Sequence, residues 1–94
     1  MGEVKTEPVT GRLVADIDAD GTQPGDFELS GDPVGGLWYN CPCGCGSQGF
    51  LAIRPATSPS WDWDGNRVSP TLTPSVHHVG HWHGFLTGGV WRSC

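Results

Sequence analysis

The chain has 94 residues, among them 15 glycines and 8 prolines, and a formal net charge of −5. A chain this short makes one small domain that buries only about 60% of its unfolded surface, which favours a structural staple beside the hydrophobic core. Residues 1–32 hold eight of the ten acidic groups and lysine and arginine form no cluster, which argues against nucleic acid as a partner. No apolar run reaches the ~20 residues of a membrane span, so no membrane partner is expected.

The first 36 residues are predicted to form an acidic N-terminal arm with a strand extension, ahead of a zinc-binding β-domain over residues 37–94. Within the arm, RLVADIDAD at residues 12–20 alternates apolar and mostly acidic positions, which is typical of a half-buried strand. FELS at residues 27–30 and GLWYN at residues 36–40 predict two more short strands. An acidic edge strand resists self-pairing but stays open to a basic surface, so we expect a positively charged protein partner or a second copy of this chain.

The second part of the chain continues the same pattern. QGFLAIRP at residues 48–55 predicts a strand that closes a hairpin around a cysteine-rich turn. A tryptophan-bearing loop and a proline-punctuated strand follow over residues 58–76, and HWHGFLTGGVWRS at residues 81–93 predicts a strand, a glycine turn and another strand. Since no segment predicts a helix, the expected fold is mainly β, a small zinc-stapled antiparallel sheet or sandwich.

Three cysteines, Cys41, Cys43 and Cys45, lie within the run NCPCGCGSQG at residues 40–49. Bridged cysteines have Cα atoms about 4.4–6.8 Å apart with a defined torsion, so cysteines this close in sequence do not pair comfortably. Thiolates that converge on one ion meet no such restraint, and Gly44 and Gly46 permit the tight turn of a zinc knuckle. The spacing is unusual, because common knuckles place two residues between ligands.

The remaining ligands are expected from His81 and His83. On an extended strand both imidazoles project to one face and Trp82 to the other, so the imidazoles can close a tetrahedron begun by the thiolates. With the cysteines this makes five candidates for four positions, and which four bind is left open. Zinc is the expected cofactor. His77 and His78 are interpreted as solvated loop residues.

The sequence assigns no catalytic residue. Ser47, Ser69 and Ser75 lack the surroundings of a nucleophile elbow. Asp62 and Asp64 are interpreted as carboxylates that cap a turn rather than as an acid/base pair.

Four motifs in a fixed order resemble the uncharacterised domain of unknown function 6527. They are CPCGCG at residues 41–46, WDWDGN at 61–66, PTLTPSV at 70–76 and HWHGFLTGGVW at 81–91. The resemblance covers residues 37–91 and leaves residues 1–36 outside. Members of that family are small proteins of bacteriophages and of bacterial mobile or ubiquitin-like conjugation gene clusters. The resemblance implies metal binding through Cys41, Cys43, Cys45 and His83, with His81 in place of a cysteine that members often carry just before that histidine. It implies no particular reaction.

Together these features favour a small structural-zinc module without enzymatic activity that binds other proteins, as a bacteriophage accessory or virion (capsid- or tail-associated) protein. The start MGEVKTEPVTG lacks the basic and apolar regions of a signal peptide, so the expected location is the cytoplasm of a bacterial host or the virion. One alternative is a zinc-dependent hydrolase with an open metal position, in which Asp62, Asp64 or His78 would serve as the base. The other is a nucleic-acid-binding zinc ribbon, which the charge disfavours.

Overall fold

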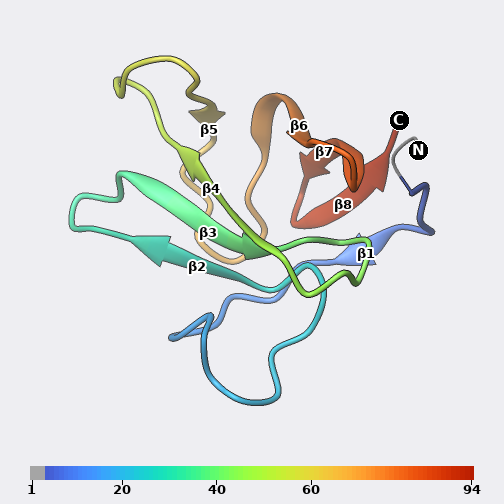
Figure 1. Cartoon of the computed structure of the whole chain (residues 1–94). Coiled ribbons are helices and arrows are strands. Elements are labelled where there is room, and N and C mark those ends of the chain that lie inside the picture. Colours follow the sequence, from blue (N-terminus) through green and yellow to red (C-terminus); the bar gives the residue numbers. More distant parts are fainter. Residues whose placement is uncertain (1–3) are drawn as a thin grey trace.

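The computed structural model describes residues 4–94, and every regular element in that range is a strand (Figure 1). A five-stranded antiparallel sheet has the order β1-β8-β7-β6-β5. Its strands are β1 (Val9–Thr10), β5 (Asp62–Trp63), β6 (Leu72–His78), β7 (Trp82–Thr87) and β8 (Val90–Ser93). A three-stranded antiparallel sheet, β2-β3-β4, consists of β2 (Phe27–Ser30), β3 (Gly36–Asn40) and β4 (Gln48–Ala52). The mainly-β prediction is therefore confirmed. Residues 4–94 contain no helix long and apolar enough to cross a membrane.

One hydrophobic core joins the two sheets. Alternate residues of each strand point inward, as the period of a strand requires. From the three-stranded sheet come Phe27, Leu37, Tyr39 and Leu51, and from the five-stranded sheet Leu72, Val76, Trp82, Leu86 and Trp91. The sheets thus bury one face each, and exposed side chains such as Trp38 and Phe85 lie on the opposite faces.

The tryptophans divide between core and surface. Trp82 and Trp91 are fully buried and meet edge to face with ring centroids 5.8 Å apart. The buried Trp91 indole N–H donates to the Gly25 carbonyl at 2.8 Å, which ties the segment before β2 to the five-stranded sheet. Trp38 instead lies on the outer face of β3 with 40% of its surface exposed, stacked on Phe50.

The prediction of a strand over residues 12–20 is wrong. Only Leu13 makes a ladder contact, a single bridge to Phe27, and the chain then turns. The Asp16 carboxylate accepts the Asp18 amide at 2.9 Å, and the Asp16 carbonyl accepts the Ala19 amide at 3.1 Å. Aspartate side chains that accept a hydrogen bond from the backbone two residues later favour turns over extended chain. Because of these local hydrogen bonds, the segment forms a turn although its sequence alternates like a strand.

The loop interpretation of His77 and His78 is also wrong, since both lie in β6, although His77 is exposed to solvent as expected. Residues of the predicted arm take part in both sheets, because β1 pairs with β8 and β2 pairs with β3. The boundary at residue 36 stays a prediction of the sequence.

Candidate metal centre and serine–histidine pairs

The cysteine turn connects β3 to β4. Its ends are closed by the Cys41 amide, which donates to the Ser47 carbonyl at 2.9 Å. Gly44 and Gly46 have φ of 85° and 83°, left-handed values that glycine adopts without strain. The sulfur atoms of the three cysteines lie within 4.8 Å of one another, and all are free thiols. The turn therefore brings together three thiols that could bind a metal ion.

The electrostatics of this turn suit a cation. Burial raises the pKa of Cys41 to about 12, and the neighbouring thiols of Cys43 and Cys45 disfavour its ionisation further. Burial opposes ionisation of Cys45 too, but hydrogen bonds from the Ser47 amide and from the other two thiols outweigh it and lower the pKa of Cys45. A soft divalent ion bound by the three sulfur atoms would stabilise all of them as thiolates.

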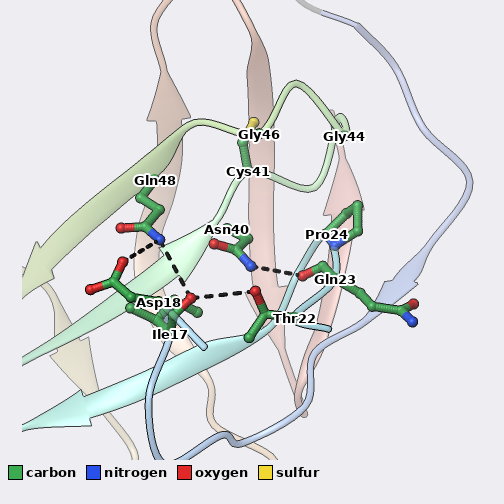
Figure 2. Close-up of a pocket in the computed structure, with 10 residues that line it drawn as sticks. All are labelled: Ile17, Asp18, Thr22, Gln23, Pro24, Asn40, Cys41, Gly44, Gly46 and Gln48. Carbon is green, nitrogen blue, oxygen red and sulfur yellow. Dashed lines mark hydrogen bonds between the residues drawn. The ribbon is translucent and has the colours of Figure 1, made fainter. Parts of the chain in front are cut away.

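A polar pocket of about 290 Å³ adjoins this turn (Figure 2). Its lining consists of Cys41, Gly44, Gly46, Asn40 and Gln48 on one side and Ile17, Asp18, Thr22, Gln23 and Pro24 on the other. The amide groups are held in place: Asn40 donates to the Gln23 carbonyl at 3.1 Å and Gln48 donates to the Asp18 carboxylate at 3.0 Å. The pocket thus offers carboxamides, backbone carbonyls, the Asp18 carboxylate and Cys41 to a bound group.

The structure places the predicted histidine ligands on the β6–β7 hairpin. In the part of the chain that is described, the group of side chains close enough to share one ion contains three cysteines and no histidine. His81 lies in the turn before β7, with its ring edge-on to His78 at 5.2 Å. His83, in β7, has its Nε2 atom 3.1 Å from the Ser75 hydroxyl. Metal ligation by His81 and His83 stays a prediction.

The Ser75–His83 pair lies on the outer face of the five-stranded sheet. Val76, Trp82 and Gly84 alternate with this pair and are buried, so Ser75 and His83 point the opposite way and are half-buried. The β6–β7 register shifts between Leu72 and Val76. Such bulges are common beside active sites, where they redirect a side chain. Here the irregularity includes Ser75.

Neighbouring side chains fix this pair. The Trp61 indole donates to the Ser75 carbonyl at 3.1 Å, which holds the backbone of the bulge. The His77 ring stacks on His83 across the strands, with centroids 4.6 Å apart. Phe85, two residues beyond His83 on the same face, is 45% exposed and provides an apolar surface beside the pair. The pair thus places a hydroxyl beside an imidazole on a sheet face that solvent can reach.

A second serine–histidine pair lies on the inner side of β6, beside the cysteine turn. His78 Nε2 is 3.1 Å from the Ser47 hydroxyl, and His78 Nδ1 is 2.9 Å from the Tyr39 hydroxyl. Burial, and then the nearby His81, lower the pKa of His78. Burial also raises the pKa of Tyr39, and negative charge at Cys41 or Cys45 would raise it further, so the phenol stays protonated.

Sequence reasoning missed both serines because it looked for a contiguous nucleophile motif. A usable signal was the succession of the two predicted strands that form β6 and β7, because consecutive strands joined by a short turn usually pair. On paired strands, residues two apart share a face, and the observed register His77↔His83 brings Ser75 diagonally opposite His83. The carboxylates considered as bases serve structure instead: Asp62 pairs with Arg54, and Asp64 accepts the Asn66 amide at 3.0 Å. The turn-capping interpretation of Asp64 is confirmed.

Comparison with known families gives a match over most of the chain. A family model described as bacterial ubiquitination-like system serine protease (BubE) matches residues 14–94. The matched segment contains the cysteine turn and both serine–histidine pairs, and it begins well before residue 36. It agrees with the ubiquitin-like gene-cluster context implied by the resemblance, under a different family name. No curated protein and no solved structure matches the chain.

Proposed function

The chain belongs to the BubE family of bacterial ubiquitination-like systems, and from this we propose that it is a serine peptidase with Ser75 as nucleophile and His83 as general base. The observation that carries the proposal is the 3.1 Å contact between the Ser75 hydroxyl and His83 Nε2 on an open sheet face. A hydroxyl is a weak nucleophile at neutral pH until an adjacent base accepts its proton, and a base within hydrogen-bond reach is the recognised signature of such activation.

The proposed reaction is acyl transfer followed by hydrolysis. As the Ser75 oxygen attacks the substrate carbonyl, its proton passes to His83 Nε2, and the protonated imidazole then donates that proton to the leaving amine or alcohol. Water, deprotonated by the same imidazole, displaces serine from the acyl group and restores both residues. The His77 ring restrains the base, since it stacks on His83.

Ser75 is a better nucleophile candidate than Ser47 for an electrostatic reason. Catalysis of acyl transfer needs hydrogen-bond donors or positive charge where the oxyanion develops. Ser47 lies at the end of the cysteine turn, and its amide already donates to the Cys45 sulfur at 3.4 Å. Without metal, negative charge at Cys45 would repel an oxyanion that develops beside Ser47, and with metal bound Ser47 borders the structural site instead. Ser75 lies on the other strand pair, where the outer face is open to solvent.

We assign the cysteine turn to zinc in a structural role. Soft thiolate donors favour zinc over the hard cations, and a core as small as this one gains stability from a metal. When bound, the ion would neutralise the thiolates of Cys41, Cys43 and Cys45 and hold the β3–β4 hairpin closed. This assignment keeps the zinc of the sequence analysis but gives the chemistry to Ser75 and His83.

The proposal therefore replaces the non-enzymatic interaction module as the preferred function. It also differs from the zinc-dependent hydrolase, because the nucleophile is a serine hydroxyl rather than metal-bound water. The virion or bacteriophage role, the basic protein partner and the cytoplasmic location stay predictions. A nucleic-acid-binding ribbon remains disfavoured by the net charge of −5.

A fluorophosphonate probe tests this function without knowledge of the substrate, because it reacts with serines activated by a neighbouring base. We expect one adduct per chain, located at Ser75 by peptide mass mapping. Ser75→Ala should abolish labelling, and His83→Ala should slow it by about 10²–10⁴-fold, the usual contribution of a general base.

Ser47→Ala is the matched control, since Ser47 also bonds a histidine at 3.1 Å. It should be labelled at the wild-type rate. An adduct at Ser47 that persists in Ser75→Ala would move the nucleophile to the cysteine turn, and a folded, zinc-loaded wild-type protein that takes no label would overturn the serine mechanism.

A further inference from the structure

The cysteine turn supplies three ligands, but a structural zinc site takes four in a tetrahedron. The fourth must come from another segment that reaches the turn. His83 is a poor candidate in this geometry, because it lies on the outer face of β7 and is engaged with Ser75. The inner side of β6 contacts the turn instead, through His78.

His78 already directs one ring nitrogen at the cysteine turn. It is half-buried, two residues after the fully buried Val76 and on the same side of β6. Its Nε2 atom is 3.1 Å from the hydroxyl of Ser47, whose backbone closes the turn onto Cys41 and donates to Cys45. The Ser47 hydroxyl is the group that His78 meets at the turn, so ligation would require Nε2 to exchange this hydroxyl for the metal.

The other ring nitrogen of His78 is held as metal-bound imidazoles usually are. A ligating histidine almost always hydrogen-bonds through its second nitrogen, which fixes the ring orientation. His78 Nδ1 is 2.9 Å from the Tyr39 hydroxyl. Tyr39 is only 3% exposed and packs on Trp91 with centroids 5.1 Å apart, so it is a rigid partner. With zinc on Nε2, the Nδ1 hydrogen would be donated to the Tyr39 oxygen.

We propose that His78 is the fourth ligand of the metal centre and that Tyr39 is the residue that orients it. The inference rests on the metal assignment above and is independent of the Ser75–His83 chemistry. It departs from the sequence-based choice of His81 and His83. His81 provides the natural comparison, because its ring contacts His78 at 5.2 Å but lies in the turn.

Cobalt(II) replacing zinc in metal-stripped protein tests the ligand set, because its visible spectrum reports coordination number and the count of thiolates. His78→Ala should bind zinc at least 10²-fold more weakly in a chelator competition and show an altered cobalt spectrum. His78→Cys should restore tight binding and strengthen the thiolate-to-cobalt absorption, since four sulfurs replace three. That rescue separates ligation from a general folding role.

The controls make each outcome decisive. His81→Ala and His83→Ala should keep wild-type affinity and spectrum, and Tyr39→Phe should weaken zinc by about 10–100-fold, as loss of a hydrogen bond to a ligand typically does. Wild-type affinity and spectrum in His78→Ala would overturn the proposal, as would their loss in His81→Ala alone. Wild-type protein that binds neither zinc nor cobalt would remove the metal centre itself, whereas fluorophosphonate labelling reports Ser75 separately.

Discussion

Replacement of Trp91 by phenylalanine tests how the segment before β2 is attached to the fold. The Trp91 indole is fully buried and donates to the Gly25 carbonyl at 2.8 Å. Phenylalanine keeps most of the ring contacts with Tyr39 and Trp82 but removes the donor. The Gly25 carbonyl that remains is buried without its partner, so most of the expected loss comes from the hydrogen bond and a smaller part from packing.

The expected loss has two parts. A buried carbonyl left without a donor costs about 1–3 kcal/mol. The smaller ring also leaves a void of roughly 40 Å³, which at ~24 cal/mol per Å³ adds about 1 kcal/mol. Trp91→Phe should therefore lower the free energy of unfolding by about 2–4 kcal/mol, a large share of the total for so small a domain.

Urea titration of zinc-loaded protein, followed by far-ultraviolet circular dichroism, measures this loss without depending on tryptophan fluorescence. Trp63→Phe is the matched control, because the half-buried Trp63 indole donates to the Asn66 carbonyl within an exposed turn. It should cost less than about 1 kcal/mol. If Trp91→Phe costs no more than this control at an unchanged denaturant slope, the reasoning about the buried carbonyl is refuted.

Three further outcomes follow from the structure. Chelation of the metal should lower the melting temperature measured by calorimetry by more than about 10 °C. Zinc binding contributes folding free energy, and 1 kcal/mol shifts the melting temperature of a domain of this size by about 4–8 °C. An unchanged melting temperature would contradict the metal centre. Hydrogen bonds from Arg12 lower the pKa of Asp26 in the folded protein. The ionised Asp26 carboxylate therefore stabilises the fold fully above the ordinary carboxyl pKa near 3.9, and this stabilisation is lost as the pH falls through the lowered pKa of the folded state. The free energy of unfolding of metal-free protein should therefore fall more steeply below about pH 4 than that of Asp26→Asn, and parallel pH profiles would exclude this role. Gly84→Ala should prevent folding, because a Cβ there would meet the Arg92 carbonyl at 2.1 Å, whereas Gly35→Ala has open space and should fold normally by circular dichroism.

Much of the strand layout was predictable because the signal is local. The segments FELS, GLWYN and QGFLA place apolar residues on one face of a short strand, and each forms the expected strand as β2, β3 and β4. The glycine turn between β7 and β8 is likewise a property of its own residues. Residues 12–20 have the same alternation but fail, since the Asp16 side chain bonds the following backbone and the Ile17 amide donates to Glu28 at 2.9 Å.

The sequence by itself determined that three thiols converge, because one-residue spacing with glycines leaves few other arrangements for the turn from Cys41 to Cys45. It could not determine which histidine lies beside the turn. His78 and His83 differ in role only because the β6–β7 register and the packing of Val76 and Trp82 turn one imidazole towards the cysteine turn and the other towards solvent. A shift of one residue in that register would exchange the two faces, and the register is set by the buried core of both sheets rather than by any residue near the site.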